Sequence, residues 1–190
     1  MHWILVSLLV FQLNSPAFEN EYVQVFKNAA PCASGGPSCA ERIVIALGAV
    51  ELEGRKMTRG DIRVFNKNEK YAPPKGGDFL EVVMRPTRPP VKTAAVTISP
   101  DKNTNLYDGE RFFIFEEKLL VGDTRVRHSH NQRLVVTINE TKLQQWVDGQ
   151  ADAIFRDSIP DNIGFNQPTV HITKNIGKNP MRNIVIELKP

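Results

Sequence analysis

Apolar residues in this chain come in short bursts separated by turn residues, and no long run follows the 3.6-residue spacing of an amphipathic helix. β-branched and aromatic side chains are frequent in these bursts, as is typical of strands. The pattern predicts strands over 42–47, 50–52, 61–65, 79–84, 94–98, 111–118, 124–137, 142–146, 153–156, 169–173 and 183–188. Many short strands at regular spacing predict an all-β protein built as a jelly-roll barrel or sandwich.

A proline-rich segment, 85–90, divides the chain into two halves. Proline donates no ladder hydrogen bond, so this segment cannot continue a central strand. We predict one β domain over 18–92 and a second over 93–190. The halves share short motifs in the same order, which favours a duplicated β unit, with chance similarity as the alternative. The paired motifs are 52–54 with 146–149, 59–61 with 157–162, and 79–86 with 184–190.

The first 17 residues resemble a cleavable leader. The run 4–13 is apolar and free of charge, and the small residues Ser15 and Ala17 follow it, as an export peptidase requires. The run is too short to span a membrane as a helix, which needs about 20 residues. We expect a signal peptide over 1–17, export to the periplasm or the exterior, and no stable membrane insertion. Because His2 stands where a leader usually has Lys or Arg, a truncated start or an amino-terminal strand remains an alternative.

Cys32 and Cys39 are the two cysteines of the chain, and they enclose a loop rich in glycine, serine and proline. Such a loop can turn back so that the two thiols meet, and an exported protein then forms a disulfide. Six intervening residues match neither the spacing of redox dithiols nor that of zinc knuckles. We predict a disulfide, with free thiols as the alternative if the leader is not real.

The charges are nearly balanced and scattered along the chain. Lys and Arg number 24 and Asp and Glu 21, which gives a formal net charge of +3. No basic run or charged stripe indicates a nucleic-acid partner. A glycine-rich phosphate loop and a Ser-His-Asp arrangement are also absent from the sequence. These features argue against nucleotide chemistry and against hydrolysis through an activated serine.

Histidine is confined to a few positions that suit a small metal site. The chain has four histidines, and His2 would leave with the leader, so His128, His130 and His171 remain. Side chains alternate across a strand, so His128 and His130 point to one face, about 6 to 7 Å apart. His171 on a neighbouring strand would complete a facial set of neutral imidazoles, the commonest protein ligands for zinc and iron. Satisfied core histidines or surface histidines are the alternatives.

Two motifs give the chain a family resemblance. The pattern Gly122-x5-His128-x-His130 resembles the first half of motif one of the cupin family, and His171-x3-Asn175 resembles the end of motif two, with Gly164 and Pro168 before it. The resemblance covers 109–190, and 23–86 resembles a degenerate unit without ligands. It implies jelly-roll cupin barrels, arranged as two tandem units, and a possible homodimer. A single cupin with an amino-terminal β extension is the alternative.

The chain departs from the family pattern at one ligand. In cupins a glutamate follows the second histidine by three or four residues, where this chain has Leu134 and Val135. Three outcomes stay open: a three-histidine site like that of some thiol dioxygenases, a replacement ligand, or a barrel that no longer binds metal. Strand alternation gives Gln132 the inward direction of His130, and Glu116 or its neighbour Glu117 is placed to turn a carboxylate inward.

The resemblance implies a divalent Fe, Mn or Zn ion and a small organic ligand. Three neutral imidazoles leave the ion at its full charge, so we expect an anionic ligand such as a carboxylate or thiolate. Alternation places Arg125 and Arg127 on the opposite, solvated face. Whether the protein is an enzyme stays open: the resemblance implies a metal-dependent oxygenase or isomerase, and the alternatives are a non-catalytic metabolite-binding cupin or a structural barrel without metal. Asn175 is expected to hold a turn.

Overall fold

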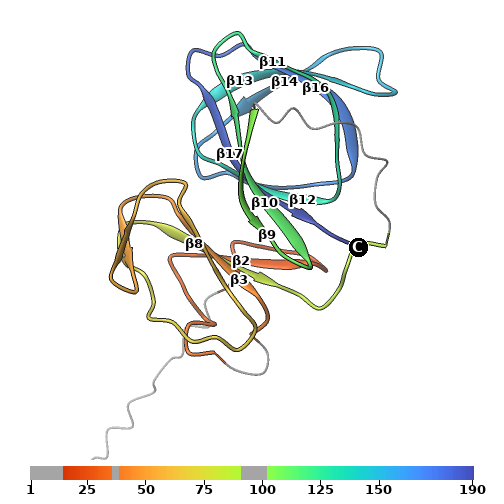
Figure 1. Ribbon diagram of the computed structural model, residues 1–190. Coiled ribbons are helices and arrows are strands. Elements are labelled where there is room, and N and C mark those ends of the chain that lie inside the picture. Colours follow the sequence, from red (N-terminus) through yellow and green to blue (C-terminus); the bar gives the residue numbers. More distant parts are fainter. Residues whose placement is uncertain (1–14, 36–38, 91–101) are drawn as a thin grey trace, which may run out of the picture.

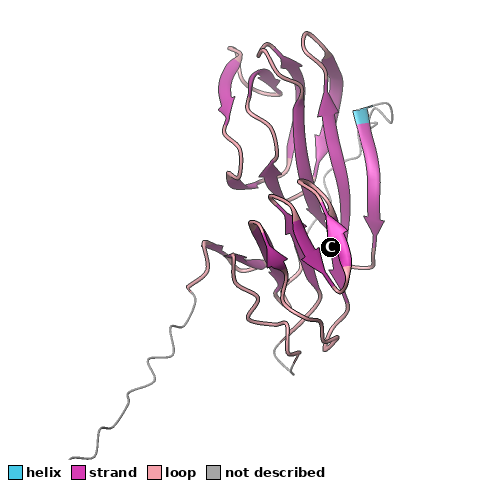
Figure 2. Cartoon of the chain, turned by 90° about the vertical axis from the view of Figure 1, so that its left-hand side faces the viewer, coloured by secondary structure: helices cyan, strands magenta, loops and turns pink. Residues whose placement is uncertain are grey.

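The computed structural model describes residues 15–35, 39–90 and 102–190. Almost all of its regular structure is antiparallel strand, as the spacing of the apolar bursts predicted (Figure 2). The strand predicted over 94–98 and residues 1–14 of the predicted leader lie outside the described residues. None of the helices in the described part of the chain is long and apolar enough to cross a membrane.

The first half forms two antiparallel sheets. The larger has the strand order β1-β2-β8-β3-β6, and the smaller has the order β5-β4-β7. The strands are β1 (Phe18–Glu19), β2 (Val23–Lys27), β3 (Arg42–Ala46), β4 (Val50–Leu52), β5 (Arg55–Met57), β6 (Ile62–Phe65), β7 (Lys75–Gly76) and β8 (Phe79–Met84).

The second half also forms two antiparallel sheets, which Figure 1 shows curving around an interior in green to blue. Their strand orders are β15-β12-β17-β10-β9 and β11-β16-β13-β14. The strands are β9 (Asn103–Asp108), β10 (Phe112–Leu119), β11 (Thr124–His130), β12 (Arg133–Thr137), β13 (Thr141–Val147), β14 (Ile154–Ser158), β15 (Ile163–Asn166), β16 (Thr169–Asn175) and β17 (Met181–Leu188).

The two halves repeat one strand order. β2-β8-β3-β6 corresponds to β10-β17-β12-β15, and β5-β4-β7 corresponds to β14-β13-β16. The paired motifs of the sequence fall at equivalent places: Gly54 and Gly149, both at positive φ, turn the β4–β5 and β13–β14 hairpins. In the described residues, β11 has no counterpart in the first half. Between β2 and β3 the chain instead forms a loop closed by a disulfide between Cys32 and Cys39.

A shared hydrophobic core joins the halves. One face of each five-stranded sheet contributes to it, with Ile43 and Leu80 from the first half and Ile114 and Leu134 from the second, all at 0% exposure. Burying each such side chain stabilises the fold by about 1.5–3 kcal/mol. The opposite face of the second sheet is thereby left to line the interior of its own barrel.

The strand predicted over 124–137 is in fact two strands in different sheets. β11 ends at His130, and β12 begins at Arg133 in the other sheet. The alternation that begins at His128 therefore stops before Gln132. The sequence pattern also missed β2, and it missed five strands that are short or rich in polar residues: β1, β5, β7, β9 and β15.

Candidate metal centre

The three histidines predicted as ligands lie on two paired strands. His128 in β11 is the register partner of His171 in β16, and His130 lies two residues further along β11. Residues two apart on a strand share a face, so all three imidazoles point into the barrel. They are buried, with exposures of 0%, 3% and 5% for His128, His130 and His171. One potential ligand nitrogen of each lies within 4.8 Å of those of the other two.

The hydrogen bonds of two histidines fix which nitrogen carries the proton. His128 Nδ1 lies 2.8 Å from the carbonyl oxygen of Val126, and His130 Nδ1 lies 3.0 Å from Oε2 of Glu187. Carbonyl and carboxylate oxygens only accept, so both Nδ1 atoms donate. In each of these two neutral rings the lone pair therefore lies on Nε2. The Nε2 atoms of His128 and His171 are 3.0 Å apart.

This donor set fits a divalent metal ion. Metal-binding histidines usually donate their other ring N–H to a carboxylate or a backbone carbonyl, as His128 and His130 do here. Two nitrogens that bind one ion at about 2.1 Å, at a right angle to each other, lie about 3.0 Å apart. The separation of the His128 and His171 Nε2 atoms has this value. Imidazole donors suit Zn and Fe alike, so the donor set alone does not select the metal.

The surroundings hold the histidines in the form that a metal needs. Burial is the largest cause, and it lowers the pKa of His128 to about 4 and that of His171 to about 3; burial also lowers the pKa of His130. The positive charges of Arg125 and Arg133 add to the lowering at all three. The imidazoles are therefore neutral at pH 7, so no proton must leave them before a metal binds.

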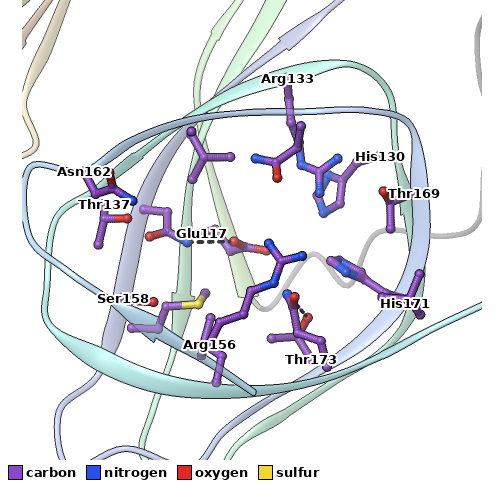
Figure 3. A pocket seen from close by; sticks show the side chains of 18 of the residues that line it. Glu117, His130, Arg133, Thr137, Arg156, Ser158, Asn162, Thr169, His171 and Thr173 are labelled. Carbon is purple, nitrogen blue, oxygen red and sulfur yellow. Dashed lines mark hydrogen bonds between the residues drawn. The ribbon is translucent and has the colours of Figure 1, made fainter. Parts of the chain in front are cut away.

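A cavity of about 200 Å³ opens beside His130 and His171 inside the second half (Figure 3). Polar residues of both sheets line much of its wall. The charged residues of the wall are Glu117, Arg133, Arg156 and Asp157. The interior of this barrel is therefore a charged chamber next to the histidines.

Arg125 does not lie on the solvated face where alternation placed it. It is fully buried and forms an ion pair with Glu117 inside the barrel. The reason is an irregularity in the β11–β16 register between Arg125 and His128, which shifts the alternation by one residue. Arg127 does lie outside, where its Nε donates to Oδ2 of Asp148 at 3.0 Å.

The two accessory residues considered from the sequence both point away from the cavity wall. Gln132 lies beyond the end of β11, and its amide donates to Oε1 of Gln167 at 2.9 Å. Glu116 pairs with Arg182. Its neighbour Glu117 has the opposite direction and lines the cavity. Of the two glutamates weighed for an inward carboxylate, the structure places Glu117 inward.

Apolar residues occupy both positions at which the cupin motif would place its glutamate ligand. Leu134 belongs to the core between the halves, whereas Val135 lines the cavity. Neither of the two positions at which the family motif has its glutamate therefore supplies a carboxylate. Asn175 holds a turn, as expected: its Oδ1 accepts from Gly177 N at 3.0 Å, and its Nδ2 donates to the Leu119 carbonyl at 3.1 Å.

Sequence reasoning missed three charged residues around the site. Glu187 holds His130, Arg133 begins β12 at the cavity wall, and Arg156 enters the cavity from β14. One signal was available for Glu187, since it interrupts the apolar run 184–188 of a central strand. For the arginines no local pattern tells an inward from an outward direction, because only the sheet order brings them to the cavity.

Comparison with known proteins agrees with this architecture. No protein-family model and no curated protein matches the sequence. A Cupin 2 conserved barrel domain protein from Leptotrichia buccalis has a similar structure, with a TM-score of 0.50 and 12% identity over 88% of this chain and 83% of its own. AerE from Microcystis aeruginosa matches 90% of this chain and 89% of its own, with a TM-score of 0.49 and 15% identity. A cupin domain from Bordetella pertussis Tohama I matches 55% of this chain and 98% of its own, with a TM-score of 0.43 and 18% identity. The chain has the jelly-roll cupin fold, as its motifs predicted.

Proposed function

We propose that this protein binds one divalent metal ion through His128, His130 and His171 and receives a small anionic organic molecule in the adjoining cavity. The observation that carries the proposal is the convergence of three buried imidazoles, two of them with Nδ1 held by an acceptor. A bound ion would supply Lewis acidity, which polarises an oxygen-containing ligand. Fe, Mn and Zn are the candidates.

The charge of the site supports an anionic ligand. Neutral imidazoles do not offset the charge of a divalent ion, and Val135 replaces the carboxylate that would. Arg133 and Arg156 in the cavity wall add positive charge. A ligand that carries a negative charge is therefore stabilised by both the ion and the wall.

The residues of the chain have distinct tasks in this proposal. Val126 and Glu187 hold the protons of His128 and His130 at Nδ1 and so direct both Nε2 atoms inward. The barrel wall limits the water that reaches the three imidazoles, which strengthens the electrostatic interactions there. These tasks would serve an oxygenase or an isomerase equally well.

A non-catalytic binding role is the second candidate, and one observation favours it. Glu117 is the less exposed of the two carboxylates in the cavity wall, but Arg125 and the amide of Asn183 already engage it. An engaged carboxylate is a poor general base, because its partners stabilise the charged form. A protein that binds a metabolite without transforming it needs no such base.

Elemental analysis tests the metal site. The protein is purified without chelators, beside the double variant His128→Ala, His171→Ala and the control Arg127→Ala, which alters the outer face of the same strand. We expect near-stoichiometric metal in the parent and the control and almost none in the double variant. A single His171→Gln variant, checked for cooperative unfolding, separates ligand loss from misfolding. Equal and negligible metal in folded parent and variants would refute the metal site.

We also propose that residues 1–17 direct export and are then removed. The apolar run 4–13 and the disulfide-forming pair Cys32 and Cys39 support this. Amino-terminal sequencing of the protein from a periplasmic or secreted fraction should begin at residue 18. Recovery of the intact amino terminus from the cytoplasmic fraction alone would contradict export.

A further inference from the structure

The arginines around the cavity differ in whether a nearby carboxylate offsets their positive charge. Arg125 forms an ion pair with Glu117. Arg133 is the register partner of Glu187, whose negative charge acts on it. Arg156 has no such carboxylate. Its guanidinium forms no hydrogen bond or ion pair in residues 15–35, 39–90 and 102–190. Arg156 is therefore the one cation of the described cavity wall whose charge is left for a ligand.

Arg133 has a structural task that the first half of the chain repeats. Its Nη1 donates to the carbonyls of Asn131 and Gln167. Arg42 occupies the equivalent first position of β3, and its Nη1 donates to the carbonyl two residues earlier and to that of Asn66, as Arg133 does in β12. The first half forms these arginine–carbonyl hydrogen bonds although its described residues hold no histidine site. The bonds of Arg133 therefore serve the barrel structure. Arg156 has no comparable bond.

Arg156 points into the chamber toward the histidines. It lies on β14, the edge strand of its sheet, and Figure 3 shows its guanidinium between Glu117 and His171. The oxygens of Glu117 are taken by Arg125 and Asn183, so Glu117 does not neutralise Arg156. Asp157 also lines the cavity, but in residues 15–35, 39–90 and 102–190 no ion pair joins its carboxylate to Arg156. The guanidinium of Arg156 is therefore available to an anion in the cavity. Its planar set of N–H donors can form two parallel hydrogen bonds with a carboxylate.

A second polar group in the same wall also lacks a partner. Asn183 is 7% exposed and lines the cavity, and its Nδ2 donates to Oε2 of Glu117 at 3.2 Å. Its Oδ1 is buried and accepts no hydrogen bond from the described part of the chain. Buried acceptors in folded proteins are nearly always satisfied, so this oxygen suits a donor carried by a ligand. A hydroxyl or amino group beside the carboxylate would supply that donor.

We propose that Arg156 binds the carboxylate of a small hydroxy or amino acid whose hydroxyl or amino group donates to Oδ1 of Asn183. The cavity of about 200 Å³ has the volume of about six or seven waters, which limits the acid to a compact molecule. This inference rests on the proposed function and narrows its anionic ligand to one class. Arg156 is thus a specificity-determining residue.

Calorimetric titration with L-lactate tests the inference on protein with and without added Zn²⁺. Lactamide, which lacks the charge, and propionate, which lacks the hydroxyl, are the comparison ligands. The variant Arg156→Gln removes the charge, and Arg127→Gln is the matched control on the outer face. We expect lactate to bind the parent, lactamide to show no binding, and propionate to bind about 3-fold to 10-fold more weakly than lactate. Arg156→Gln should weaken lactate at least about 10-fold with unchanged metal content, and Arg127→Gln less than about 2-fold.

The results separate this inference from the metal site. Lactate binding that depends on Arg156, in a protein that takes up no Zn²⁺ when Zn²⁺ is added, would support the inference and refute the metal proposal. Stoichiometric metal together with equal lactate affinity in the parent and Arg156→Gln would refute the inference alone. Absence of lactate binding to the parent at tens of millimolar, or equal affinity for lactamide, would also overturn it.

Discussion

The Nε2 atoms of His128 and His171 lie 3.0 Å apart across the β11–β16 pair. At that distance two facing lone pairs repel unless a proton or a metal ion lies between them. Since the ring proton of His128 is held at Nδ1 by Val126, its Nε2 can only accept or coordinate. Either a proton on Nε2 of His171 or a metal ion therefore joins the two nitrogens.

Metal removal should destabilise the protein. A ligand that binds only the folded state stabilises it by about 2.7 kcal/mol at a free concentration 100 times its Kd. We expect Zn²⁺ to raise the midpoint of thermal unfolding and a chelator to lower it. The variant His171→Asn should lose most of this response, whereas Arg127→Ala should keep it. An identical Zn²⁺ response in the parent and His171→Asn would place the ion elsewhere.

Glu187 should tune metal affinity without touching the ion. The variant Glu187→Gln removes the charge that holds the Nδ1 proton of His130. Loss of such a partner typically costs 10-fold to 100-fold in metal affinity, that is, about 10-fold or more here. Competition with a metal-sensitive dye measures the change. Glu116→Gln, which alters an outward carboxylate paired with Arg182, is the matched control and should leave the affinity unchanged.

The buried ion pair of Arg125 and Glu117 should matter for folding. Their side chains are 0% and 12% exposed. The variant Glu117→Ala breaks the ion pair of the fully buried Arg125, and removing one partner of a buried pair typically lowers the free energy of unfolding by about 3–5 kcal/mol. Asp148→Ala, which breaks the exposed pair with Arg127, should cost less than about 1 kcal/mol. Urea denaturation compares the two variants, and equal losses would contradict the inward placement of Arg125.

The metal-free protein should lose stability as the pH falls below about 6.5. The pKa values of His128 and His171 are about 4 and about 3 in the folded state, below the ordinary value of about 6.5 in the unfolded chain. Between these values the unfolded chain binds more protons, so acid favours unfolding. From pH 7 to pH 5 we expect a loss of about 2 kcal/mol per histidine. Urea denaturation of chelated protein measures it, and His171→Asn should show a smaller loss; an unchanged slope in the variant would exclude His171 as a source.

The sequence predicted the fold class and the three converging histidines because both depend on short-range rules. Alternation along a strand places His128 and His130 on one face, and turn residues separate the strands. Those rules failed where the backbone is irregular. The bulge in β11 turned Arg125 inward, and the end of β11 at His130 released Gln132 from the predicted face.

The contacts of Glu187 and Arg156 could not be predicted from the sequence, because they depend on the pairing of strands that are far apart in the chain. Glu187 reaches His130 because β17 lies in the centre of the opposite sheet, and Arg156 reaches the cavity because β14 closes the edge of the other sheet. Neither contact has a local pattern, since each joins strands far apart in the chain. The disulfide loop between β2 and β3 takes the place of β11, so in the described residues the first half lacks the strand that carries His128 and His130.

X-ray absorption spectroscopy of the Zn²⁺-loaded protein tests the central claim most directly, because it counts the imidazoles bound to the ion. The account predicts one bound zinc with three imidazole nitrogens at about 2.0–2.1 Å and oxygen completing the shell. The spectrum of His130→Ala should show two imidazoles. A parent spectrum with no imidazole scattering, or with sulfur ligands, would contradict a three-histidine centre.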